Sequence, residues 1–150
     1  MADDWIILIP DNPSFVPDAE RQSRARRRFG EIAPDADEIN LIVSDTVEFF
    51  HCGVNFERVL CPSCGAEIPD AWWKERMDDD HDNGFTLSSY STPCCGRQYT
   101  LHDLKYEWPQ GFGRFALEAM NPNIGRLDEE RRQELEGVLA TKLRVIYCHL

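Results

Sequence analysis

The chain has 150 residues, of which 42% are hydrophobic and 29% are charged, a composition that fits one globular domain rather than a disordered chain. Its 27 acidic and 16 basic residues give a formal net charge of −11, which argues against general binding to nucleic-acid backbones or anionic membranes. The longest apolar run, residues 5–9, is too short to cross a bilayer, and the acidic start of the chain does not resemble a signal peptide. We therefore expect a cytoplasmic protein that does not bind membranes.

The first fifty residues predict a strand, a helix and two further strands. Residues 5–9 form a β-branched run that is closed by proline, which is typical of a buried strand. A helix is expected over residues 17–30, because proline suits the first helical position and glycine suits the residue after the last. Apolar alternation then predicts strands at residues 38–44 and 46–51, separated by a turn at Ser44.

The last forty residues repeat this order. Residues 114–120 predict a strand, although their Ala, Leu, Glu and Met residues also suit a helix. Acidic residues at 128–130 open a second helix, because negative charge is favourable at a helix start. Alternation over residues 142–147 predicts the strand that follows.

Two β-α-β units at the two ends of one chain predict an α+β fold. In this prediction residues 1–52 and 109–150 form a single sheet-and-helix sandwich, and residues 53–108 form an inserted zinc-ribbon-like module. The whole chain is then one domain. No low-complexity or Ser/Gly-rich linker divides it.

Between the cysteines, residues 69–77 predict a short helix that carries Trp72 and Trp73. Packing in the module core is the favoured role for the two tryptophans, and a ligand-binding platform is the alternative. The acidic run at residues 78–82 lacks the spaced ligands and the turn glycine of a calcium loop. A solvated acidic turn is therefore expected there.

Six cysteines in a chain without a secretory signal indicate metal binding rather than disulfides. Cys61 and Cys64 have the spacing of a zinc knuckle, and Gly65 permits the positive-φ turn that such a knuckle needs. The second half of the site is Cys94 with Cys95, between a proline and a glycine that provide a turn. The sequence predicts that these four thiolates hold one structural Zn²⁺, because a closed set of four ligands leaves no position for water.

Alternatives remain for the fourth ligand and for the metal. If only one of the adjacent cysteines binds, the fourth ligand is His81, His102 or Cys52. Zinc is favoured over iron because the sequence shows no electron-transfer partner, although a four-sulfur site also suits iron. The competing interpretation is that the cysteines are small buried hydrophobic residues.

Five segments carry a resemblance to a known family. They read DWIILIP at 4–10, NFERVLCPSCG at 55–65, TPCCG at 92–96, DLKYEWP at 103–109 and FALEAMNP at 115–122. Together they resemble an uncharacterised family of small bacterial cysteine-knuckle, zinc-ribbon-like proteins with no established activity. The resemblance spans nearly the whole chain, and it implies a bacterial, free-standing cysteine-knuckle protein.

A metal-dependent or cysteine-dependent enzyme is one alternative function. The sequence offers three candidate pairs of catalytic side chains: Cys52 beside His51, Cys148 beside His149, and His102 beside Asp103. Neighbours on a strand point to opposite faces, so the cysteine–histidine pairs do not form a thiol–imidazole contact by themselves. No phosphate-binding glycine loop, serine elbow or metalloprotease motif is present in the sequence. We therefore assign no catalytic residue.

Nucleic-acid binding by the zinc ribbon is a second alternative. The surface after the second knuckle offers Arg97, Gln98, Tyr99 and Lys105. Residues 51–110 hold ten acidic and five basic residues, too few bases to neutralise several phosphates at once. We therefore expect a non-catalytic, acidic zinc-binding protein that acts by protein–protein binding to a basic partner, as a toxin-neutralising (immunity) protein or an adaptor.

Overall fold

A computed structural model describes residues 3–150 and shows helices combined with antiparallel strands, which confirms the predicted α+β class. The larger sheet and its helices comprise β1 (Asp4–Pro10), α1 (Ala19–Ile32), β2 (Glu38–Phe50), β8 (Gly111–Met120), α3 (Glu129–Leu139) and β9 (Leu143–His149). The segment between β2 and β8 contains β3 (Val59–Leu60), β4 (Glu67–Ile68), α2 (Asp70–Asp82), β5 (Tyr90–Ser91), β6 (Gln98–Tyr99) and β7 (Lys105–Tyr106).

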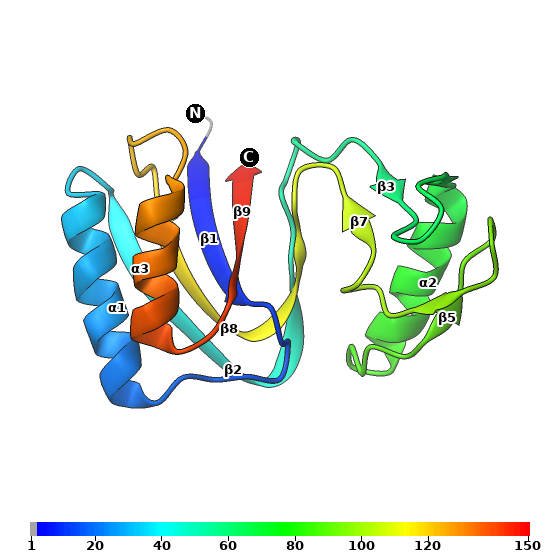
Figure 1. Cartoon of the computed structure of the whole chain (residues 1–150), viewed down its shortest axis with the longest axis horizontal. Helices are drawn as coiled ribbons and strands as arrows, with labels where there is room; N and C mark the ends of the chain where they lie inside the picture. The colour runs from blue at the N-terminus through cyan, green and yellow to red at the C-terminus, as the bar shows by residue number, and fades with distance from the viewer. Residues whose placement is uncertain (1–2) are drawn as a thin grey trace.

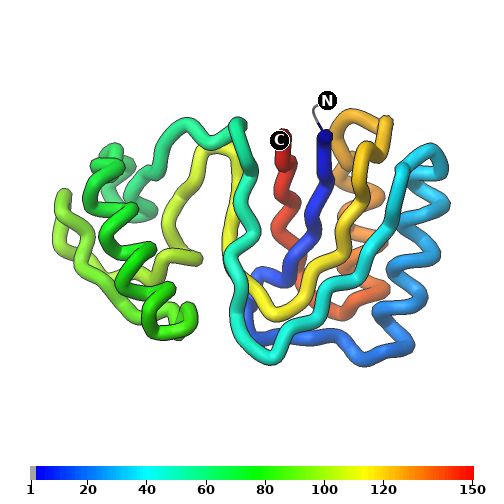
Figure 2. The backbone as a smooth tube through the Cα atoms, turned by 180° about the vertical axis from the view of Figure 1, so that it is seen from behind, coloured from blue at the N-terminus to red at the C-terminus, as the bar shows by residue number. Residues whose placement is uncertain are grey.

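Helices α1 and α3 cover one face of the larger sheet. Figure 1 shows them side by side on the left, with α2 and the short strands beyond the opposite face. Seen from behind in Figure 2, this second part is joined to the sheet by two stretches of chain, one after β2 and one before β8. Among residues 3–150, none of the helices has both the length and the apolar character needed to cross a bilayer.

Strands from both ends of the chain share the larger sheet. Its order is β2-β8-β1-β9, and each neighbouring pair is antiparallel. It follows that β1 and β2 run parallel with β8 between them, and that β8 and β9 run parallel with β1 between them. The two ends of the chain are therefore held together by the ladder on both sides of β1.

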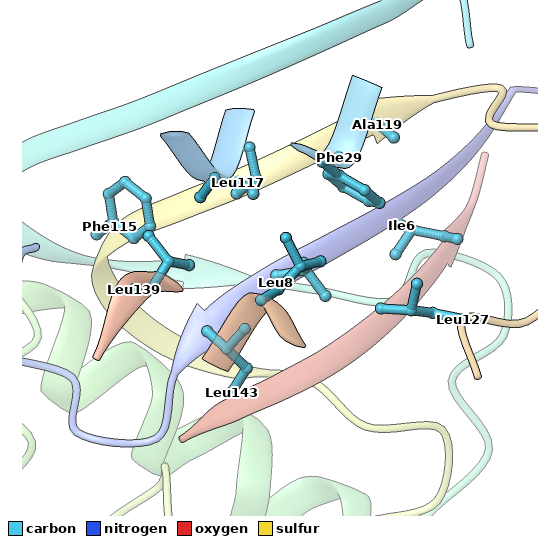
Figure 3. Packing of buried hydrophobic residues seen from close by; sticks show 11 residues of the cluster. Ile6, Leu8, Phe29, Phe115, Leu117, Ala119, Leu127, Leu139 and Leu143 are labelled. Atoms are coloured by element: carbon cyan, nitrogen blue, oxygen red, sulfur yellow. The ribbon is translucent and has the colours of Figure 1, made fainter. Parts of the chain in front are cut away.

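Both helices begin at acidic residues and bury one face each, but α1 starts at Ala19 rather than at Pro17 and continues through Gly30 to Ile32. Asp18 and Asp128 are the N-caps, and their side chains accept hydrogen bonds from the backbone N–H groups of Arg21 and Arg131 at 2.9 and 2.7 Å. The core lies between these helices and the sheet, as Figure 3 shows. Its labelled side chains are Ile6, Leu8, Phe29, Phe115, Leu117, Ala119, Leu127, Leu139 and Leu143.

Two expectations about the strands are corrected. Residues 38–50 form the single strand β2 rather than two strands separated by a turn. The pairing of β2 with β8 shifts register between Val43 and Glu48, which is a β-bulge, and the carbonyl of Ser44 accepts a hydrogen bond from Arg114 Nε at 3.0 Å. The residues between Val43 and Glu48 are left out of the ladder at the bulge, while both halves of β2 stay paired with β8. The helical alternative for residues 114–120 is wrong, because they belong to β8.

Aromatic side chains join the second part of the chain to the sheet. Trp73 stacks on Phe56 with ring centroids 5.2 Å apart, and its Nε1 donates to the hydroxyl of Tyr106 at 3.1 Å. Phe49 at the end of β2 contacts both Trp73 and Phe112. Trp73 therefore packs in a core, as the sequence predicts, and ties the small sheets to the large one.

The acidic run at residues 78–82 is not a solvated turn, because it forms the last part of α2. Asp80 is fully buried, and its carboxylate accepts hydrogen bonds from the backbone N–H groups of Leu87 and Ser88 and from the hydroxyl of Tyr90 at 2.9–3.0 Å. A buried carboxylate is stable only with such partners. Asp80 thus fixes the chain that leads from α2 into β5.

Candidate metal centre

The four cysteines predicted to bind metal come together at the tips of two small hairpins. Cys61 and Cys64 lie between β3 and β4, and Cys94 and Cys95 lie between β5 and β6. All four Sγ atoms lie within 4.8 Å of one another, with 3.7 Å between Cys61 and Cys95 and 3.4 Å between Cys64 and Cys94. A tetrahedral ion with sulfur ligands at about 2.3 Å separates neighbouring sulfurs by about 3.8 Å. The donor set and its spacing therefore fit one four-coordinate metal ion.

Both hairpin tips fold into the same six-residue turn. In the first, Cys61 donates its backbone N–H to the carbonyl of Ala66, and Gly65 donates to the carbonyl of Cys61, both at 2.9 Å. In the second, Thr92 and Arg97 make the first of these bonds at 2.9 Å, and Gly96 donates to Thr92 at 3.0 Å. Both turn glycines have a φ of +74°.

The equivalence of the two turns places one cysteine in an unusual position. Thr92 takes the place of Cys61, and Cys94 takes the place of Ser63. Counted along each six-residue turn, the first turn supplies its ligands from positions one and four, Cys61 and Cys64. The second turn supplies them from positions three and four, Cys94 and Cys95. Adjacent cysteines can both reach one ion here because the turn, rather than an extended strand, sets their directions.

Ser63 and Thr92 carry hydroxyls at the two turn positions where the other turn has a cysteine. Ser63 Oγ lies 3.3 Å from the Sγ atoms of both Cys61 and Cys95, and Thr92 Oγ1 lies 3.5 Å from that of Cys95. The hydrogen bond from Ser63, followed by the backbone N–H of Cys64, lowers the pKa of Cys61 to about 5, and Ser63 and Thr92 also lower the pKa of Cys95. Metal ligation requires thiolates, so these hydroxyls favour the binding form of Cys61 and Cys95. Although the backbone N–H of Ala66 lowers the pKa of Cys64, the hydrogen bond with Cys94 and desolvation outweigh it and raise this pKa to about 11.

The other candidates for the fourth ligand lie outside this group of sulfurs. His102 is buried and uses both ring nitrogens, since Nδ1 accepts from the backbone N–H of Phe112 at 3.0 Å and Nε2 lies 2.8 Å from the carbonyl of Asp11. Cys52 is buried beneath the sheet, where its thiol donates to the side-chain carbonyl of Gln110 at 3.4 Å. His81 is exposed on α2 and packs its ring edge against Phe85.

Comparison of this chain with known protein families, with curated proteins and with solved structures finds no match. The chemistry of the centre is therefore inferred from its own residues: four sulfur ligands, a tetrahedral spacing and two turns with hydrogen bonds to sulfur. These features suit a metal that prefers soft, four-coordinate sites.

A thiol–imidazole contact forms between residues far apart in the sequence. Cys148 Sγ in β9 lies 4.0 Å from Nδ1 of His51, which follows β2, close to the isolated bridge between Gly53 and His149. Burial raises the pKa of Cys148 to about 11, so the thiol stays protonated at neutral pH. His51 Nδ1 also accepts the backbone N–H of Gly53 at 3.0 Å. Pairing each cysteine only with its sequence neighbour misses this contact, because the residues after β2 meet β9 only in the folded chain.

Burial of His102 predicts a pH dependence of stability. Burial, followed by the nearby charge of Arg144, lowers the pKa of His102 to about 4, whereas an unfolded histidine titrates near 6.5. The unfolded state therefore binds the extra proton first, so stability falls as the pH drops from about 6.5 to about 4. From this group we expect a loss of about 2 kcal/mol between pH 7 and pH 5, measured by urea unfolding. The NMR signals of the His102 ring should stay nearly constant over that interval. A titration midpoint near 6.5 in the folded protein would contradict the lowered pKa of His102.

Proposed function

We propose that this chain is a non-catalytic, zinc-binding acidic protein that acts by binding a basic protein partner, in the manner of a toxin-neutralising (immunity) protein or an adaptor. The observation that carries the proposal is the set of four mutually close sulfurs, because four protein ligands leave no position on the metal for substrate or water. The bound ion then has a structural role. Bacterial origin, a cytoplasmic location and kinship with small cysteine-knuckle proteins belong to the same proposal.

The arrangement of elements supports a finer description of the fold. We propose that β1-α1-β2 and β8-α3-β9 are two β-α-β units, each with a strand of the other unit between its own two strands. Residues 53–108 would then be a zinc-ribbon-like insertion into a single domain. Both cysteine turns lie inside that insertion, and the metal would hold its two hairpins together.

Zinc is the metal that we propose for the centre. The small sheets around it are only two or three short strands each, so backbone pairing contributes little to their stability. Four thiolates on one ion join the two hairpins directly. In such small units the binding free energy of the metal becomes folding free energy.

Helix α2 presents the surface that we propose for the partner. Glu75, Asp78, Asp79 and Asp82 are exposed and share one face by their three- and four-residue spacing. Arg76 pairs with Glu75 and Asp79 at 2.8 and 3.3 Å. Asp78 and Asp82, in contrast, have no arginine partner among residues 3–150. An acidic stripe on a metal-stabilised module would speed the encounter with a basic protein.

The tagged protein is first purified from its native cells together with the protein that binds it. The two proteins are then purified separately and mixed in a stopped-flow instrument. We expect the association rate to fall at least about tenfold between roughly 50 and 500 mM salt. Asp78→Lys with Asp82→Lys should slow association further. Asp45→Lys with Glu130→Lys makes the same change of charge on exposed residues of the larger sheet and of α3, and should have a smaller effect.

An enzyme is the competing outcome, and the contact between Cys148 and His51 favours it. The raised pKa of Cys148 argues against a reactive thiolate there. Turnover that is lost in His51→Ala, with the fold intact, would reject the binding proposal. Association that does not depend on salt would reject the acidic surface as the binding site.

A further inference from the structure

A cavity of about 380 Å³ opens at the end of the larger sheet where β1 begins and β9 ends. Figure 1 shows the start of β1, the end of β9 and the loop between β8 and α3 at this same end of the molecule. The lining includes Trp5, Asn55, Trp108, Asn123, Arg126 and Tyr147. None of these six residues is a cysteine of the metal centre, so the cavity is a separate feature.

Arg126 is held between two aromatic rings at the wall of this cavity. Its guanidinium carbon lies 5.8 Å from the ring centroid of Trp108 and 5.7 Å from that of Tyr147. Arg126 is exposed, and no carboxylate of residues 3–150 lies within 4.0 Å of it. Other surface arginines such as Arg97 also lack a carboxylate partner, and Arg126 differs from them by lying over two aromatic rings at the wall of a cavity. In a chain with a charge of −11, an arginine that keeps its planar N–H edge unpaired is prepared to bind an anion.

The aromatic wall of the cavity depends on a backbone conformation that bulky residues rarely adopt. Trp108 has a φ of +58°, in the left-handed region, and it precedes Pro109. Such strain persists only where the surrounding structure enforces it, and it is concentrated at binding sites. Trp5 lines the same cavity, and its buried indole N–H has no hydrogen-bond partner among residues 3–150. Buried indole N–H groups usually have one.

We propose that this cavity binds a small molecule that carries a flat ring and a carboxylate or phosphate group. The ring would contact the indoles of Trp5 and Trp108, and the anion would take paired N–H donors from Arg126. Asn55 uses its side-chain N–H group on the carbonyl of Tyr147 at 3.0 Å, which leaves its oxygen as an acceptor for a polar group on the ring. Asp4 also lines the cavity, and its carboxylate contacts Nδ1 of His149. The proposal does not depend on the metal or on the protein partner.

Titrations followed by amide NMR test the proposal with four probes. Adenosine 5′-monophosphate and indole-3-acetate each combine a ring with an anion, one as a phosphate and the other as a carboxylate. Adenosine is the matching control without the phosphate, and indole is the matching control without the carboxylate. We expect saturable one-to-one binding by at least one of the first two probes, at least about tenfold tighter than by the matching control. Which of the two binds distinguishes a phosphate ligand from a carboxylate ligand.

Substitution of the arginine decides whether the anion is bound where the geometry places it. Arg126→Gln should weaken binding at least about tenfold, with an unchanged melting temperature as the check on folding. Arg97→Gln removes an exposed arginine beside the metal centre and should leave binding unchanged. Two results would overturn the proposal: no saturable binding of either combined probe up to about 5 mM, or equal binding by the Arg126→Gln variant.

Discussion

Cys61→Ser should abolish stoichiometric metal binding and unfold residues 53–108 before the larger sheet. The native protein should contain about one tightly held zinc, for which structural sites provide an apparent binding free energy of roughly 10–16 kcal/mol. Removal of one thiolate breaks the four-sulfur set that joins the two hairpin tips. Metal analysis and hydrogen exchange measure the two effects. Cys148→Ser, at a buried thiol outside the centre, is the matched control and should retain the metal.

A swap within the second turn tests the ligand positions themselves. Cys94→Ser should weaken zinc binding, because it removes the ligand at the third position of the turn. Thr92→Cys combined with Cys94→Ser should restore binding, because Thr92 occupies the place that Cys61 has in the first turn. A well-folded, reduced wild-type protein without metal would contradict the site. Full zinc affinity in Cys95→Ser would move the fourth ligand elsewhere.

Asp80→Ala should destabilise the segment after α2 by about 3 kcal/mol. The substitution removes the buried acceptor of two partly buried backbone hydrogen bonds, from Leu87 and Ser88, and of the bond from the hydroxyl of Tyr90. Urea unfolding gives the loss of free energy, and hydrogen exchange at the amides of Leu87 and Ser88 shows where it acts. Both amides should exchange much faster in the variant.

The control for Asp80 lies two residues earlier on the same helix. Asp78 is exposed, and Asp78→Ala should change the free energy of unfolding by no more than about 0.5 kcal/mol. Equal losses in the two variants would mean that the carboxylate of Asp80 does not fix the chain leading to β5. An intermediate loss in Asp80→Asn is expected, because the amide keeps one acceptor oxygen.

Local signals in the sequence were sufficient for most elements of the larger sheet. Asp18 and Asp128 mark the helix starts because an N-cap acts on backbone groups within three residues. The apolar run at residues 5–9 becomes the strand β1, whose neighbours on both sides come from the end of the chain. The sequence also pointed to the four sulfurs that come together, because the cysteine–glycine turns are local structures.

The sequence by itself thus determined most strands and helices of the larger sheet and the two cysteine turns, since each of these depends on neighbouring residues. Only the tertiary structure decided that β2 continues through its bulge, because the partner strand β8 lies far along the chain. It also decided that Asp80 is buried, since the hydrogen-bond donors come from residues that fold back onto α2. The position of Arg126 between Trp108 and Tyr147 arises in the same way, from three segments that meet only in the folded chain. Contacts of this kind leave no periodic pattern in the sequence, because they depend on how distant segments pack.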